Sequence, residues 1–146
     1  MNYFLNILIC LFLTVGPGFA QEASDKASDK KRSSTEIVHL AWEASNKVDL
    51  NAVSALVDEA LKNYSTQARH LASQLGTFPA RDKYNDYKVM SDVATVLFIY
   101  AEALRNQGKN DEAKKQFQEI IDQYPWAQSW DASRGAYWSI KEKSQA

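Results

Sequence analysis

Apolar residues recur at helical spacing along most of the chain after residue 33. They follow an i, i+3, i+4 pattern in four stretches that are separated by polar residues, glycine or proline. The stretches contain Ile37, Leu40, Ala41 and Ala44, then Val53, Val57, Ala60, Leu61 and Tyr64, then Val89, Val93, Leu97, Tyr100, Ala101 and Leu104, and finally Ala113, Phe117, Ile120, Ile121 and Tyr124. This pattern predicts an all-α fold.

Residues that favour helix ends bound several of these stretches. Ser33 and Glu36 have the spacing of a capping box, and Asp49 can cap the helix that follows it. Gly108 suits the left-handed residue that ends a helix, and Pro125 cannot continue one. These residues predict helix starts near Ser33 and Asp49 and helix ends at Gly108 and Pro125.

Three segments do not follow this simple pattern of helices and turns. Residues 49–75 can form one helix or two joined near Ser65, and residues 77–85 are expected to be a loop. Val93 to Tyr100 is rich in β-branched and aromatic residues, which favours a strand in isolation, but the helical stripe on both sides outweighs it. A final short helix is expected at residues 131–143.

The N-terminal segment has the pattern of an export signal. Residues 1–20 contain no Asp, Glu, Lys or Arg, and the apolar run from Phe4 to Val15 is too short to cross a bilayer. Its length suits the apolar core of a signal peptide, and small residues precede a cleavage point near Ala20, although no basic residue precedes Phe4. We expect residues 1–20 to be a signal peptide, so that the mature protein is periplasmic or extracellular.

A polar segment follows the predicted signal peptide. Residues 21–33 contain the tandem repeat Ala-Ser-Asp-Lys and no apolar stripe, which predicts a disordered tether before a helical domain at residues 34–146. The single cysteine, Cys10, lies within the signal peptide. The mature domain therefore has no disulfide to stabilise it.

Charge and motif content exclude several function classes. The 17 Lys and Arg residues balance the 18 Asp and Glu residues, so no long-range field attracts nucleic acid, and the mature part has no membrane span. His39 and His70 lack the spacing of a metal site, and the sequence has no phosphate-binding loop or nucleophile elbow. Carboxylates gather at Asp82, Asp86 and Asp92, but their pairing cannot be derived from spacing. We expect no enzyme activity, cofactor or metal.

Residues 94–125 resemble a tetratricopeptide repeat, a helix–turn–helix unit of about 34 residues. The matching residues are Leu97, Ala101, Leu104, Gly108, Ala113, Phe117 and Pro125. A weaker copy lies 60 residues upstream, where Val53 and Val57 stand in the places of Ala113 and Phe117. The resemblance implies a short antiparallel helical-hairpin array of about two repeats plus a terminal helix.

The same resemblance implies protein binding on the concave face that the first helices of such repeats line. Carried over by position, that face comprises Thr95, Phe98, Glu102, Arg105 and Asn106, with Phe98 as an exposed aromatic side chain. The alternative is that Phe98 packs on a neighbouring helix and that the others are solvated. On the first interpretation the protein is an exported scaffold or adaptor with a protein partner.

Three of the four tryptophans, Trp126, Trp130 and Trp138, fall within a short C-terminal stretch. They can form a patch that binds a small ligand or glycan, because Trp gives a large contact area at small entropic cost. Alternatively, the segment folds back and caps the open end of the helical array. Self-association through uncovered apolar ends is a third hypothesis.

Overall fold

The computed structural model describes residues 31–146. The predicted signal peptide and residues 21–30 of the predicted tether lie outside the described residues. Residues Arg32–Ala146 form one compact unit.

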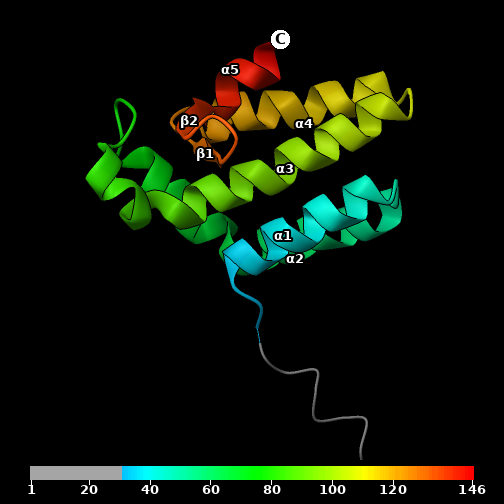
Figure 1. Ribbon diagram of the computed structural model, residues 1–146, viewed down its shortest axis with the longest axis horizontal. Coiled ribbons are helices and arrows are strands. Elements are labelled where there is room, and N and C mark those ends of the chain that lie inside the picture. The colour runs from blue at the N-terminus through cyan, green and yellow to red at the C-terminus, as the bar shows by residue number, and fades with distance from the viewer. Residues whose placement is uncertain (1–30) are drawn as a thin grey trace, which may run out of the picture. The chain divides into compact units, whose positions relative to one another are not determined.

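The elements of this unit are mostly helices, with one short β-hairpin near the C-terminus (Figure 1). In chain order they are α1 (Ser34–Asn46), α2 (Leu50–Ser73), the 3₁₀ helix η1 (Arg81–Tyr87), α3 (Lys88–Asn106), α4 (Asn110–Gln123), β1 (Gln128–Asp131), β2 (Ala136–Ser139) and α5 (Ile140–Gln145). The predicted all-α array of antiparallel helical hairpins is confirmed, and the two-stranded sheet is a minor addition.

Helix α3 is the centre of the array. It packs against α1 and α2 on one side and against α4, β1 and α5 on the other (Figure 1). Every residue from Met90 to Ile99 is buried, so this helix is covered all round its axis. Residues 93–99 are apolar except for Thr95 and are buried on all sides, which explains why this sequence also resembles a buried strand.

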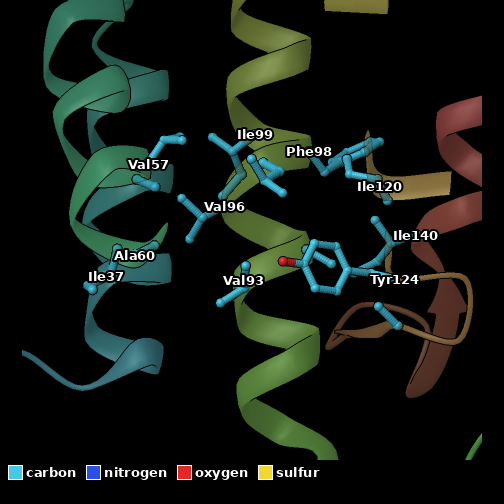
Figure 2. Packing of buried hydrophobic residues seen from close by; sticks show 14 of the residues in the cluster. Ile37, Val57, Ala60, Val93, Val96, Phe98, Ile99, Ile120, Tyr124 and Ile140 are labelled. Carbon is cyan, nitrogen blue, oxygen red and sulfur yellow. The ribbon is translucent and has the colours of Figure 1, made fainter. Parts of the chain in front are cut away.

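The hydrophobic core has two layers, one on each side of α3 (Figure 2). In the first layer, Ile37 of α1 and Val57 of α2 contribute to the same buried cluster as Val96 of α3. The second layer joins α3 to α4 and α5 through buried residues that include Ile120 and Ile140. Both layers are continuous, so the helical hairpins share a single core.

The turn between α1 and α2 is repeated, hydrogen bond for hydrogen bond, in the turn between α3 and α4. The amide of Val48 donates to the carbonyl of Ser45 at 2.9 Å, and the amide of Asp49 donates to the carbonyl of Ala44 at 3.0 Å. Sixty residues later, Gly108 bonds to Arg105 at 2.9 Å and Lys109 to Leu104 at 3.0 Å. Both turns are Schellman motifs, in which a left-handed residue ends the first helix.

This correspondence extends from the turns to the helices. Helices α1 and α3 end 60 residues apart, at Asn46 and Asn106, and α2 and α4 begin 60 residues apart, at Leu50 and Asn110. Ala41 and Ala101, which hold equivalent places in the first helices, are both 0% exposed. The upstream copy indicated by the sequence is therefore a second helical hairpin of the same construction.

The structure resolves one predicted element that was left open and corrects two others. Residues 50–73 form one continuous helix, which resolves the alternative that the sequence left open. The expected loop at residues 77–85 is wrong from Arg81 onwards, because a 3₁₀ helix starts there. The expected final helix at residues 131–143 is wrong up to Ser139, where the β-hairpin ends, and only α5 is helical.

The β-hairpin forms because its turn and its cross-strand pairs favour it locally. The carboxylate of Asp131 accepts hydrogen bonds from the amide of Ser133 at 2.9 Å and from that of Arg134 at 3.3 Å, and Gly135 adopts a φ of 61°. Trp130 lies directly opposite Tyr137, an aromatic pair that stabilises antiparallel strands. These turn-forming residues therefore favour a hairpin more strongly than the weak apolar spacing of the segment favours a helix.

Candidate functional site

The residues of α3 that the sequence predicts as a binding face are only partly accessible to solvent. Thr95 is 3% exposed and donates its hydroxyl hydrogen to the carbonyl of Ser91 at 2.7 Å. Glu102 and Arg105 pair at 2.6 Å, and both keep contact with solvent, as does the exposed Asn106. The C-terminal half of the row is therefore accessible to a partner, whereas its N-terminal half is not.

The expectation that Phe98 is an exposed aromatic is wrong. Its ring lies 5.3 Å from that of Trp138 on β2 and 5.9 Å from that of Phe117 on α4, and the residue is 9% exposed. Phe98 packs on Phe117 of the neighbouring helix α4, as the alternative interpretation expected, but the other part of that alternative does not hold for Thr95, which is buried. The hairpin covers Phe98 because Trp138 lies on the strand face that turns toward α3, a contact that sequence spacing does not reveal.

Trp42 of α1 is a surface residue that is not among the binding residues predicted from the sequence. It is 40% exposed, which is unusual for a large aromatic side chain, and it stands 60 residues before Glu102. Because the two hairpins have the same construction, Trp42 holds the place on α1 that Glu102 holds on α3. The 60-residue offset was a signal that could have identified it from the sequence.

The three C-terminal tryptophans do not converge on one patch. Trp126 packs edge-on against Phe78 at 5.5 Å, Trp138 lies against Phe98, and Trp130 lies 5.0 Å from Tyr137. Trp130 is 48% exposed, while the other two are half-buried. Each ring thus joins a different aromatic contact of the fold.

The segment that carries these tryptophans closes one side of the array. Tyr124, Ala127 and Ile140 are all 0% exposed, and the amide of Ile140 donates to the carbonyl of Ala127 at 3.2 Å. Helix α5 packs mainly on α4 (Figure 1). This arrangement agrees with a cap on the helical array, which leaves Trp130 as the exposed tryptophan of the three.

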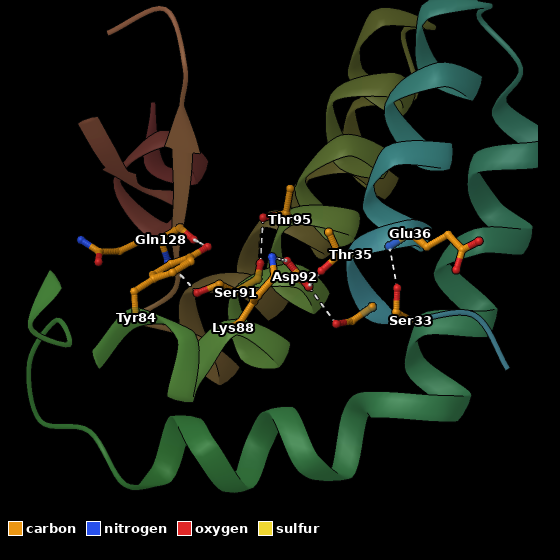
Figure 3. Close-up of polar contacts among 10 residues, drawn as sticks. Ser33, Thr35, Glu36, Tyr84, Lys88, Ser91, Asp92, Thr95 and Gln128 are labelled. Carbon is orange, nitrogen blue, oxygen red and sulfur yellow. Dashed lines mark hydrogen bonds and ion pairs between the residues drawn. The ribbon is translucent and has the colours of Figure 1, made fainter. Parts of the chain in front are cut away.

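A buried polar cluster connects α1 to the start of α3 (Figure 3). Asp92 is 6% exposed, and its carboxylate accepts hydrogen bonds from the hydroxyls of Ser34 at 2.7 Å and Thr35 at 2.9 Å. The ammonium group of Lys88 lies 3.6 Å from the other carboxylate oxygen. These hydrogen bonds and the ion pair join α1 to α3, and Lys88 lies at the solvent-facing edge of the cluster.

The carboxylates singled out in the sequence do not come together as a site. Asp92 is buried in the cluster just described, whereas Asp82 and Asp86 are exposed on η1. Within residues 31–146, no three His, Cys, Asp or Glu side chains are grouped so that they could hold a metal ion. His39 and His70 are both on exposed helix surfaces.

Tyr84 links η1 to the β-hairpin. Its ring lies 4.4 Å from that of Tyr137, and its hydroxyl donates to the carbonyl of Gln128 at 3.4 Å. Burial, reinforced by the negative charge of Asp92, raises the pKa of Tyr84 to about 12. The hydroxyl therefore stays protonated and keeps its hydrogen bond at any ordinary pH.

We expect alkaline pH to destabilise the fold through this tyrosine. In the unfolded chain its pKa is near 10, so the unfolded state loses the proton first, and stability falls as pH rises from about 10 to about 12. Urea denaturation between pH 9 and pH 12 measures the slope. The variant Tyr84→Phe should show a shallower slope, and an unchanged slope would contradict this assignment.

Comparison with known protein families identifies one segment of the chain. Residues 95–125 match the family model of the tetratricopeptide repeat. These residues form a tetratricopeptide repeat. The match begins within α3 and runs through α4 to Pro125, so it coincides with the second helical hairpin. Searches of curated proteins and of solved structures found no match to the chain.

The tetratricopeptide repeat indicates a scaffold for protein–protein interaction. In this repeat Ala101 and Ala113 are 0% and 2% exposed, which allows α3 and α4 to approach closely, while Phe117 covers the seam beside Phe98. Repeats of this family are typically not catalytic. None of the helices described in residues 31–146 is both long and apolar enough to span a membrane.

Proposed function

We propose that this protein is an exported helical-repeat scaffold or adaptor that binds another protein in the cell envelope or extracellular space. The observation that carries the proposal is the tetratricopeptide repeat at residues 95–125, together with the equally built hairpin before it. A repeat array of this kind presents a continuous surface from its successive first helices.

The binding surface we propose comprises the accessible residues of the two first helices. On α3 these are Glu102, Arg105 and Asn106, and on α1 the equivalent row contains Trp42. Arg105 also lies 5.8 Å above the ring of Phe117, which holds its guanidinium in place. Tryptophan and arginine are among the residues that contribute most to binding at protein interfaces.

Export is supported by the sequence of residues 1–20, which has the apolar core and small-residue ending of a signal peptide. Expression of the full chain with its own leader tests this part. Mass spectrometry of the exported fraction should give a mature N-terminus at Gln21. Retention of the intact chain inside the cell would contradict it.

Site-specific photocrosslinking tests the binding surface. A benzoylphenylalanine side chain at position 42 should give a discrete adduct with a protein of the exporting compartment, because this position faces outward on the proposed surface. The same group at position 55, an exposed alanine of α2, is the matched control. Equal crosslinking at both positions, or none at either, would contradict the proposed surface.

The competing function is binding of a small ligand or glycan through Trp126, Trp130 and Trp138. It is favoured only by the exposure of Trp130, since the other two rings are engaged in the fold. Tryptophan fluorescence against a glycan panel tests it. A spectrum that saturably shifts in the parent but not in Trp130→Ala would favour this function over the scaffold.

A further inference from the structure

The two repeated turns flank a shallow, open hollow at one end of the array. Both turns lie at the same end of their hairpins (Figure 1), and between them is an open hollow of about 530 Å³. Residues 47–51 of the first turn line it, together with Gln107 and Lys109 of the second. This surface is distinct from the α1 and α3 row and from the tryptophans.

Val48 is the unusual residue of this hollow. Its φ of 58° lies in the left-handed region, which β-branched residues rarely adopt because the side chain crowds the backbone. Its side chain is also 71% exposed, more than that of Trp42 or Trp130. Val48 thus combines an unfavourable backbone conformation with an apolar side chain turned toward solvent.

The fold itself does not require valine at this position. The second turn makes the same hydrogen bonds with Gly108, whose φ is 76° and which has no side chain to crowd the backbone. A glycine at position 48 would serve the turn as well. Residues in strained conformations often occur where they contact a ligand or partner, and packing within the described chain does not explain Val48.

The charges around Val48 indicate the kind of partner. Lys47 lies beside it, and no carboxylate in residues 31–146 is within ion-pairing distance of that lysine. Lys109 lies 3.8 Å from Glu112 in an exposed pair, which binds it only weakly. The carboxylate of Asp49 also lines the hollow, where it accepts the amide hydrogen of Ala52 at 3.0 Å and faces the positive N-terminal end of α2. The hollow therefore presents two lysine side chains beside the apolar residues Val48 and Leu50, with Asp49 as the one carboxylate of its lining.

We propose that this hollow docks an acidic segment of a partner protein. An apolar side chain of that segment packs on Val48, and its carboxylates pair with Lys47 and Lys109. The inference rests on the proposed protein-binding function and adds to it a second surface of defined chemistry.

A titration of the isotope-labelled full chain tests the site directly. The probe is a synthetic peptide of alternating glutamate and leucine, with a lysine–leucine peptide as its charge control. The acidic peptide should cause saturable amide shifts concentrated at residues 47–51 and 107–109, and the basic peptide should cause none there. Replacing both lysines (Lys47→Glu and Lys109→Glu) should weaken binding about tenfold or more.

The variant Val48→Gly separates binding from stability. Glycine relieves the backbone conformation, so the melting temperature should be no lower than that of the parent, while affinity for the acidic peptide falls by about fivefold or more. The reverse change in the second turn, Gly108→Val, should lower the melting temperature because it introduces the crowded conformation there. If Val48→Gly binds as tightly as the parent, Val48 is not the anchor and the proposal fails.

The remaining outcomes are also decisive. Amide shifts that are spread over the domain, or that do not saturate, overturn the acidic-segment site. If crosslinking at position 42 recovers a partner while the hollow binds no acidic peptide, the scaffold function stands and this inference alone falls. Specific binding at the hollow without any adduct at position 42 supports this inference and locates the binding surface here instead.

Discussion

Replacing Phe98 with alanine should lower the free energy of unfolding by about 3–5 kcal/mol, the largest effect we expect from a single substitution. Phe98 is 9% exposed and stands where three elements meet, since its ring contacts Phe117 of α4 and Trp138 of β2. Its removal leaves a cavity between the repeat and the cap. Chemical denaturation followed by far-ultraviolet circular dichroism measures the loss.

Two related variants show whether position and shape account for that effect. Phe98→Leu retains most of the apolar volume and should cost about 1 kcal/mol. Phe117→Ala removes the same side chain from a half-buried position and should cost about 1–3 kcal/mol, less than Phe98→Ala. A larger loss for Phe117→Ala than for Phe98→Ala would contradict the packing described for the cap.

The second large effect is expected at Asp92. The variant Asp92→Ala should cost about 2–4 kcal/mol, because hydrogen bonds to a charged group are strong and their loss leaves the hydroxyl of buried Ser34 without its acceptor. Thr35 and Lys88 lose a partner at the same time. Thermal and urea denaturation at neutral pH measure the change.

The matched control for Asp92 is Asp86, which lies nearby in the sequence but is exposed on η1. Asp86→Ala should change stability by less than about 0.5 kcal/mol, as most surface substitutions do. Asp92→Asn, which keeps one acceptor oxygen, should fall between the two alanine variants. Equal effects at positions 86 and 92 would show that the buried cluster does not join α1 to α3.

The sequence predicted the repeat correctly because its determinants are local. Gly108 and Pro125 act on the backbone of their own turn, and the alanines at positions 101 and 113 report where two neighbouring helices touch. The 60-residue offset indicated the first hairpin in the same way, through positions along one helix face. Helix α3 was also identified despite its β-branched residues, since its stripe continued on both sides.

Helix periodicity could not predict which residues of a helix face are accessible to solvent. Phe98 has the position of a concave-face residue in its helix, yet Trp138, which is 40 residues further along the chain, covers it. The two hydroxyl donors to Asp92, Ser34 and Thr35, are also remote in sequence, on α1. Spacing along a helix says which side chains share a face, but it does not say which distant segment packs on that face.

By itself, then, the sequence determined the helical hairpins, their turns and the tetratricopeptide character of residues 95–125. Only the tertiary structure decided that the C-terminal β-hairpin packs on the helices as a cap, that Phe98 lies beneath it, and that Trp42 and Val48 remain exposed. The physical reason is the range of the interactions. Helix periodicity and turn geometry depend on neighbouring residues, whereas burial depends on contacts between segments far apart in the chain.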